Sequence, residues 1–456
     1  MTLMNSTLRA RSPIVGKAMT NTQTLTLFKA STATYTYTNR ADTQRGKSTM
    51  RVPISTDYGT NNTNRPIYVA ATSQHVGKTT TCLALMTGLK KRFPQSVGFL
   101  KPVGQQHVPV YSEELKKQIR VDKDVSLIRE RFNLQHLDYR YMSPVLIPGG
   151  YTKDYIDGKI DFERQMEIIR NAVSNISEQN EVVLCEGTGH CGVGSVVGAS
   201  NAKVASMIGA DMVLVANGGL GKCFDELELN RVLCEHHNVK VAGVIINKVM
   251  LDKYDQTKDY MGRALKQHWG VPLIGCIPDK PYLGCPALAD LERLFQTKMI
   301  SGEMHRFQHY TVHDINLVTT SLTRFLSNLR EKPSRTLYLC HVTRDDIILG
   351  FLGEYQRRKR NGTPSEAALI ICGRTKKYNL SKELRDIIGL DEDIPVLLSP
   401  YTTHHTMEMI HSDTPKLNID DTSRVDAAVN HYEKYIDYDM LLSQTGNALY
   451  SERVAS

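Results

Sequence analysis

The stretch Ala71-Thr72-Ser73-Gln74-His75-Val76-Gly77-Lys78-Thr79 decides the fold of this chain. The run Pro66–Ala71 predicts a β-strand before it, and Lys78–Leu85 predicts a helix after it. A loop between a strand and a helix presents backbone N–H groups and the positive end of the helix dipole to an anion. Lys78 is expected to neutralise β- and γ-phosphate oxygens, and the Thr79 hydroxyl to reach Mg²⁺. The stretch therefore predicts a phosphate-binding loop, although Thr72 stands where the usual pattern has glycine.

Apolar and β-branched runs alternate with helical stretches on both sides of this loop. The expected strands are Ile67–Ala71, Val97–Lys101, Val182–Glu186, Met212–Ala216, Val241–Asn247 and Leu273–Ile277. Such alternation predicts an α/β domain over residues 65–285, with a parallel sheet covered by helices on both faces. The proline-rich stretch 275–281 ends it, because paired prolines do not continue a helix or a central strand.

A second, smaller α/β domain is expected over residues 300–440, followed by a tail over 441–456. Its expected elements are the strands Thr336–Cys340, Ala367–Cys372 and Pro395–Leu398 and the helices Asp345–Arg358 and Ser381–Ile388.

Residues 1–64 differ in composition from the rest of the chain. Basic residues are scattered there among many Ser and Thr, and no acidic residue precedes Asp42. This composition is typical of a transit peptide and predicts a mitochondrion or plastid as the destination. The alternative is a disordered tail or a wrongly assigned start, in which case we expect a cytoplasmic protein.

The composition of the 456 residues limits the classes of partner. No stretch approaches the length of about 20 apolar residues that a membrane span needs, so no membrane partner is expected. The net charge of +8 comes partly from the N-terminal segment and from 357–360, and no nucleic-acid-binding motif accompanies it. Nine cysteines occur without metal-ligand spacing, which favours buried, reduced thiols.

Two charged residues end expected strands of the first domain. Glu186 ends Val182–Glu186 and lies where parallel sheets bind ligands, so it is a candidate for holding Mg²⁺. Lys101 ends Val97–Lys101 and suits an anionic phosphate or carboxylate. Both residues also admit a simpler interpretation as surface charges at turns.

With these pieces in order, residues 66–280 resemble the dethiobiotin synthetase-like group of P-loop proteins, which includes cobyrinic acid a,c-diamide synthetases. That group has the form A/G-T-x-x-x-V-G-K-T, so the missing first glycine is a feature of the group. The resemblance implies ATP and Mg²⁺ as cofactors. The nucleotide-binding residues that it implies are Thr72, Ser73, Gln74, His75, Val76, Gly77, Lys78, Thr79 and Thr80, with Asn247 at the adenine. It also implies Thr79, Asp124 and Glu186 around Mg²⁺, and Lys78, Lys101 and Glu186 as catalytic residues.

A second resemblance covers more of the chain. The stretches 186–197, 225–227 and 414–422 look like the N-terminal region of long phosphotransacetylases and their free-standing relatives, which join a dethiobiotin synthetase-like domain to a DRTGG domain. The motif that names the second domain is altered here, to His341-Val342-Thr343-Arg344-Asp345-Asp346. This resemblance implies a homo-oligomer, with a dimer as the expected form.

These features leave several functions open, and whether the chain is an enzyme stays undecided. The first is a nucleotide-responsive regulatory protein with at most slow ATP hydrolysis. The second is an ATP-dependent ligase that acts on a small carboxylate or amine. In favour of the first, Glu186 is followed by Gly-Thr-Gly-His and Lys101 by Pro-Val-Gly-Gln, where dethiobiotin synthetases have other residues. A third alternative, an interaction scaffold, has no need of the Gly-Lys-Thr chemistry.

Overall fold

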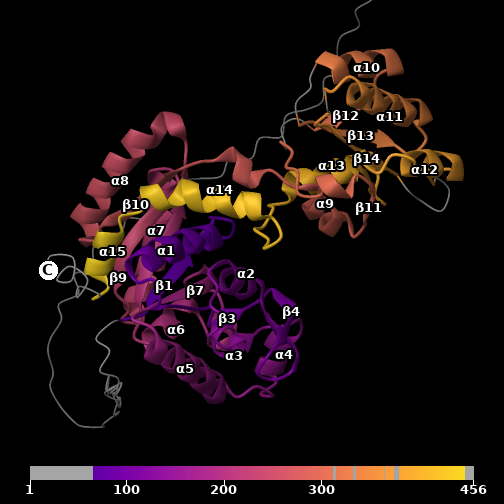
Figure 1. Cartoon of the computed structure of the whole chain (residues 1–456). Helices are drawn as coiled ribbons and strands as arrows, with labels where there is room; N and C mark the ends of the chain where they lie inside the picture. The colour runs from indigo at the N-terminus through magenta and orange to yellow at the C-terminus, as the bar shows by residue number, and fades with distance from the viewer. Residues whose placement is uncertain (1–64, 312–314, 332–334, 364, 374–378, 447–456) are drawn as a thin grey trace, which may run out of the picture. The chain divides into compact units, whose positions relative to one another are not determined.

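The computed structural model describes residues 65–311, 315–331, 335–363, 365–373 and 379–446. The predicted transit peptide or tail over 1–64 lies outside these residues, as does the end of the chain from 447. Two large sheets organise the described part, and each belongs to an α/β domain (Figure 1).

The first domain is built on a sheet of six parallel strands in the order β10-β9-β8-β1-β7-β2. Its strands are β1 (Ile67–Ala71), β2 (Val97–Leu100), β7 (Val182–His190), β8 (Asp211–Asn217), β9 (Val241–Val249) and β10 (Leu273–Pro278). Its helices up to β10 are α1 (Lys78–Arg92), α2 (Lys123–Arg131), α3 (Tyr139–Met142), α4 (Tyr151–Ile156), α5 (Phe162–Gln179), α6 (Asn201–Met207), α7 (Gly221–His236) and α8 (Tyr254–Trp269).

Helices cover both faces of this sheet. Every residue of β1 is buried, as expected for a strand with a helix layer on each side. The hydroxyl of Tyr68 in β1 donates to Oδ1 of Asn201, at the start of α6, over 3.0 Å. Helix α1 packs on β1 as well. The predicted P-loop NTPase-type fold is therefore confirmed for this domain.

The six predicted strands are all present, and β7 and β9 continue beyond their predicted ends. A hairpin of β4 (His107–Ser112) and β5 (Lys117–Asp122) was not predicted, and two short strands, β3 (Val103–Gly104) and β6 (Val145–Leu146), pair nearby. Most of the hairpin is exposed or half-buried, so it lacks the apolar run by which the core strands are recognised.

The second domain has a smaller mixed sheet in the order β11-β15-β14-β13-β12, in which β11 is antiparallel to β15. Its strands are β11 (Met299–Ser301), β12 (Asn316–Leu317), β13 (Leu337–His341), β14 (Ala368–Cys372) and β15 (Val396–Leu398). Its helices are α9 (Leu288–Phe295), α10 (Leu322–Glu331), α11 (Asp345–Arg360), α12 (Lys382–Gly389) and α13 (Thr403–Ser412).

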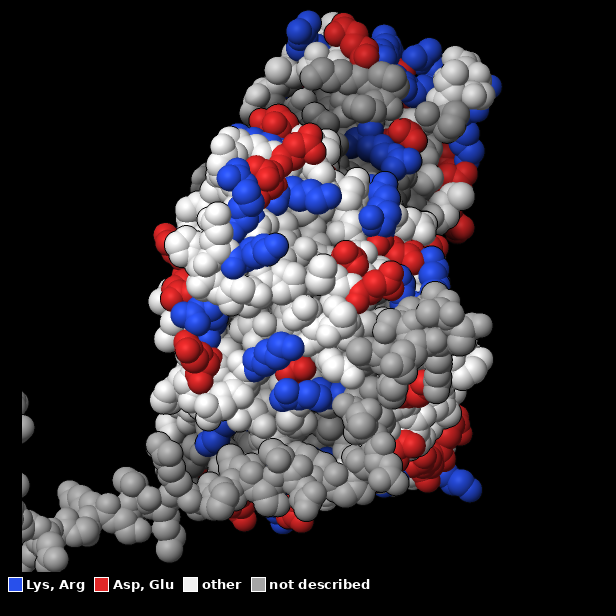
Figure 2. Space-filling view, turned by 90° about the vertical axis from the view of Figure 1, so that its left-hand side faces the viewer, with Lys and Arg blue, Asp and Glu red and all other residues white. Residues whose placement is uncertain are grey.

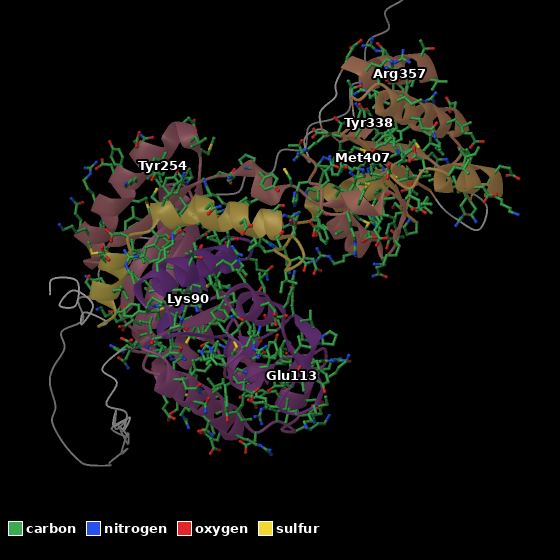
Figure 3. The ribbon with its side chains drawn as sticks, in the orientation of Figure 1. Lys90, Glu113, Tyr254, Tyr338, Arg357 and Met407 are labelled. Atoms are coloured by element: carbon green, nitrogen blue, oxygen red, sulfur yellow. The ribbon has the colours of Figure 1, made fainter. Side chains whose placement is uncertain are left out.

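Side chains of this sheet alternate between two apolar clusters. Tyr338 and Cys340 of β13 belong to a cluster with α10, α11 and α12, whereas Leu337 and Leu339 belong to one with α9 and α13. Figure 3 labels Tyr338 within the second domain and Met407 on α13. A strand that alternates in this way is covered on both faces, so the predicted second α/β domain is confirmed as a mixed sheet with helices.

The last two helices, α14 (Thr422–Tyr432) and α15 (Tyr438–Gln444), pack into the core of the first domain. Val425 and Leu441 are buried in that core, and the Tyr438 hydroxyl donates to the Ala84 carbonyl of α1 at 2.8 Å. The predicted bounds of the second domain, 300–440, and of the tail, 441–456, stay a prediction. In the structure, side chains after residue 421 pack into the core of the first domain.

Two predictions from composition concern the described residues. All nine cysteines are buried and free, as predicted. Within the described ranges, no helix has the length and apolar character that crossing a bilayer requires.

Candidate functional site

The loop between β1 and α1 is held by contacts at both ends. At its start the Thr72 N–H donates to the Val215 carbonyl at 2.8 Å, and the Thr72 hydroxyl donates to Glu226 Oε2 at 3.1 Å. At its end Gly77 has a φ of 97°, the left-handed region that favours glycine. A Cβ at Gly77 would lie only 2.4 Å from Asn247 Nδ2. The backbone of the loop is therefore fixed before any ligand binds.

Asn247 is fully buried and binds the loop itself. Its Nδ2 donates to the Val76 carbonyl at 2.7 Å, and its Oδ1 accepts from the Lys248 N–H at 2.8 Å. Its predicted contact with adenine stays a prediction, whereas its contact with the loop was not predicted.

Lys78, Thr79 and Glu186 meet at one point, as the sequence indicated. Lys78 Nζ lies 2.7 Å from Glu186 Oε1, and the Thr79 hydroxyl donates to the same oxygen at 2.9 Å. Glu186 is fully buried, and its Oε2 has no hydrogen-bond partner among the residues that the structure describes. Burial raises the pKa of this carboxyl, and the charge of Lys78 opposes the shift. A buried oxygen without a partner leaves one position for a cation or a water molecule.

Lys101 is buried between two carboxylates. Its ammonium lies 2.9 Å from Asp122 Oδ1 and also forms an ion pair with Asp124. Burial opposes the charged form, but the carboxylates outweigh it and raise the pKa of Lys101. For Asp124, burial is likewise outweighed, mainly by the Lys101 charge, and the pKa falls to about 2. Lys101 and Asp124 therefore form a charged pair at neutral pH.

Asp122 was missed from the sequence. It ends the unpredicted strand β5 and caps α2 by accepting from the Asp124 N–H at 2.9 Å. The pattern Asp-x-Asp at the start of a helix was the available signal, since an acidic residue at this position accepts backbone N–H groups.

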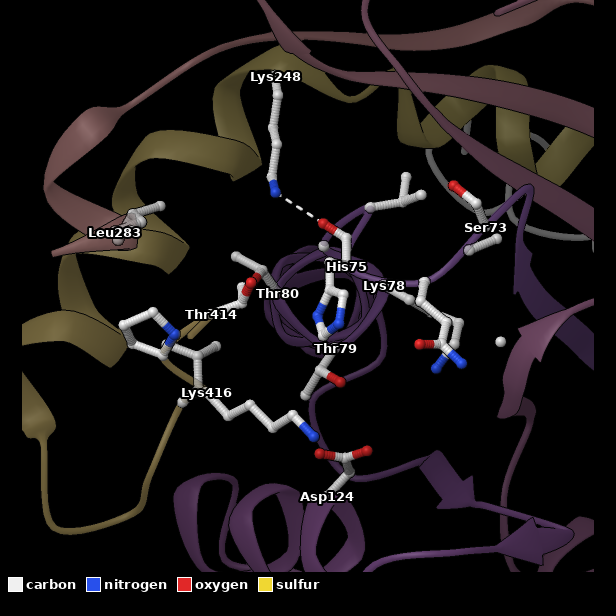
Figure 4. A pocket seen from close by; sticks show the side chains of 18 of the residues that line it. Ser73, His75, Lys78, Thr79, Thr80, Asp124, Lys248, Leu283, Thr414 and Lys416 are labelled. Atoms are coloured by element: carbon white, nitrogen blue, oxygen red, sulfur yellow. Dashed lines mark hydrogen bonds between the residues drawn. The ribbon is translucent and has the colours of Figure 1, made fainter. Parts of the chain in front are cut away.

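A cavity of about 580 Å³ opens over the loop (Figure 4). The predicted residues that line it are Ser73, Gln74, His75, Val76, Gly77, Lys78, Thr79, Thr80, Lys101 and Asp124. Three others, Thr72, Glu186 and Asn247, are buried and do not belong to its lining. The predicted residues therefore lie close together: ten of them line the cavity, and three are buried.

The lining carries more positive than negative charge. Its charged residues are Lys78, Lys101, Lys248, Lys280 and Lys416 against Asp124 and Asp279. Lys248 was not predicted, and its Nζ donates to the His75 carbonyl at 2.7 Å, drawn as a dashed line in Figure 4. On the outer face shown in Figure 2, basic and acidic residues are interspersed. An excess of lysines inside the cavity favours an anionic ligand.

The donors at the loop fit a magnesium ion bound together with phosphates. Among the described residues, no group of three or more His, Cys, Asp or Glu side chains is arranged to hold a metal alone. Mg²⁺ in nucleotide sites takes one or two protein ligands and completes its shell with phosphates and water. The Thr79 hydroxyl and the buried Glu186 carboxylate, which is unpartnered at Oε2, match that requirement.

Residues 65–287 match the family model described as an AAA domain. A phosphate acetyltransferase of Nitrosomonas europaea is 25% identical over 391 residues, covering 83% of this chain and 51% of the relative. An ATP-dependent dethiobiotin synthetase of Xanthomonas euvesicatoria pv. vesicatoria is 25% identical over 216 residues, covering 47% of this chain and 91% of the synthetase. Among solved structures, the MinD cell division protein of Aquifex aeolicus matches at 18% identity with a TM-score of 0.28, covering 48% of this chain and 84% of MinD.

The resemblance to dethiobiotin synthetases and to the N-terminal region of phosphotransacetylases is confirmed by these matches. The chain spans about half the length of the phosphate acetyltransferases that it matches. The DRTGG-like character of the second domain stays a prediction.

Proposed function

We propose that the P-loop domain binds MgATP and that the chain is a nucleotide-responsive regulatory protein with at most slow ATP hydrolysis. The observation that carries the proposal is the meeting of Lys78 and Thr79 with the buried carboxylate of Glu186 beside a cavity rich in lysine. A buried acid paired with the loop lysine keeps both side chains in place until phosphates and a metal ion take over their charges.

Each residue has a definite role in this proposal. Lys78 and the loop N–H groups bind the phosphates, and Thr79 and Glu186 hold Mg²⁺. The metal ion, when bound, neutralises charge on the β- and γ-phosphate oxygens. Asn247 keeps the loop in its binding conformation through the Val76 carbonyl.

A calorimetric titration with MgATP tests the proposal. Lys78→Ala is expected to weaken binding by at least about 100-fold, because a charge-assisted contact to phosphate is lost. The matched control is Lys90→Ala on the same helix (Figure 3), since Lys90 is not among the residues that line the cavity. Binding of MgATP to Lys78→Ala with the affinity of the parent would exclude this loop as the nucleotide site.

The regulatory part of the proposal rests on the substrate side of the cavity. Lys101 is already neutralised by Asp122 and Asp124, so its charge is less available to a transferring phosphoryl group than that of an unpaired lysine. Steady-state assays should therefore find slow hydrolysis of ATP, which disappears in Lys78→Ala.

An ATP-dependent ligase is the second candidate, because the cavity extends past Lys101 to Thr188 and Gly189 and leaves room for a small substrate. Its test is product formation from MgATP, bicarbonate and diaminopelargonate, measured by mass spectrometry beside a Lys101→Ala control. We expect little or no dethiobiotin, because a substrate displaced by about 1 Å loses roughly 100-fold in rate. Rapid product formation that depends on Lys101 would favour the ligase.

A further inference from the structure

The segment Thr414–Leu417, between α13 and α14, lines the same cavity as the phosphate loop. Leu417 packs against the core of the first domain. Just beyond it, Asp426 of α14 forms an ion pair with Arg131 of α2 at 2.5 Å. Because α2 begins at Lys123 and carries Asp124 in its first turn, these contacts place the segment on the side of the cavity where Asp124 lies.

Lys416 is the charged residue of this segment. Figure 4 shows its side chain pointing toward Asp124. No carboxylate of the described residues lies within 4.0 Å of its ammonium, so it forms no ion pair there. Asp124, the nearest acid in the view, is paired with Lys101 instead.

Lys416 is one of five lysines that line the cavity, against two aspartates. An excess of lysines over carboxylates in the lining raises the local potential and attracts an anion. The cavity that these five lysines line is the one proposed above for the nucleotide.

We propose that Lys416 is a second phosphate-binding lysine, which the chain returning from the second domain supplies to the nucleotide. The inference rests on the proposed binding of MgATP at the loop. A nucleoside polyphosphate held by both Lys78 and Lys416 joins the P-loop to the connection between α13 and α14. Binding of the nucleotide should then favour the ordered form of this connection, and ordering of the connection should raise the affinity for the nucleotide by the same factor.

Titration of four proteins with MgATP tests the role of Lys416. They are the parent, Lys416→Met, Lys416→Arg and Lys382→Met, the last altering an exposed lysine that does not line the cavity. We expect Lys416→Met to weaken binding about tenfold, Lys416→Arg to stay within about threefold, and Lys382→Met to match the parent. An equal loss in Lys382→Met would indicate a general effect of net charge and would overturn the inference.

Trypsin supplies a second readout that does not depend on affinity. Trypsin can cleave the chain after Lys416. MgATP is expected to slow the rate of that cleavage at least fivefold and to leave the rate of cleavage after Lys382 unchanged. Protection should disappear in Lys78→Ala, in which nucleotide no longer binds.

The outcomes separate this inference from the proposed function. If the parent binds MgATP through Lys78, but Lys416→Met binds within twofold and no protection occurs, the role of Lys416 is wrong and the loop site stands. If the parent does not bind MgATP at all, both proposals fail.

Discussion

Gly77 and Asn247 form a contact whose energetics can be worked out from the structure. Substitution of Gly77 by Ala places a Cβ 2.4 Å from Asn247 Nδ2 and keeps an unfavourable φ of 97°. The left-handed conformation costs about 1–2 kcal/mol, and displacing Asn247 from the Val76 carbonyl costs about 1–3 kcal/mol more. Gly77→Ala should therefore lower the free energy of unfolding by about 2–5 kcal/mol.

The same change should cost less once Asn247 is removed. In an Asn247→Ala background the clash is absent, so Gly77→Ala adds only the conformational cost of about 1–2 kcal/mol. The double-variant cycle should thus give a coupling energy of about 1–3 kcal/mol. Gly262→Ala in α8 is the control, because the nearest atom to its added Cβ lies at 3.9 Å.

Urea unfolding followed by Trp269 fluorescence is the assay. Trp269 is the sole tryptophan of the chain and stacks on Phe224 in the first domain with ring centroids 4.5 Å apart, so its signal reports on that domain. Gly262→Ala is expected to be neutral or to stabilise by about 0.5–1 kcal/mol. Costs of Gly77→Ala and Asn247→Ala that add within about 0.5 kcal/mol in the double variant would refute the contact.

Three further predictions concern buried groups. Lys78→Met should destabilise the protein more as the pH rises and less as it falls, because the raised pKa of Glu186 lets that carboxyl take up a proton as the pH falls; melting curves at several pH values measure this. Arg424→Met should cost about 3 kcal/mol in urea unfolding, the lower end for a broken buried ion pair, since Asp290 and Asp421 lose this guanidinium but keep Arg293 and His309 as partners. Tyr438→Phe should cost about 1 kcal/mol, read from Trp269 fluorescence, because one buried hydrogen bond to α1 is lost.

The phosphate loop, the strand and helix beside it, and two charged residues of the site could be predicted from short stretches of sequence. The apolar run before Thr72 and the Gly-Lys-Thr after it identified β1, the loop and α1. Lys101 and Glu186 were found because each follows an apolar run, and the ends of such runs meet at one edge of a parallel sheet. In the structure Lys101 directly follows β2, whereas Glu186 lies within the longer β7.

Other features depend on contacts between residues far apart in sequence, which no local pattern reveals. Asn247 holds the loop across 171 positions, and nothing near Asn247 indicates that its partner is Val76. Asp122 escaped notice because the hairpin before it is largely exposed. The pattern of α14 predicts an apolar face, but it does not say which domain that face will bind.

The return of α14 and α15 to the first domain has a consequence for the order in which the chain is made. The core of that domain contains side chains from 67 to 442, so the last of them leaves the ribosome after the whole second domain has been synthesised. Until then α1 lacks the side chains of α14 and α15 that pack on it, including Tyr438. The second domain, whose own clusters span only 288–410, can fold earlier. Of the two described domains, the one nearer the N-terminus is therefore completed last.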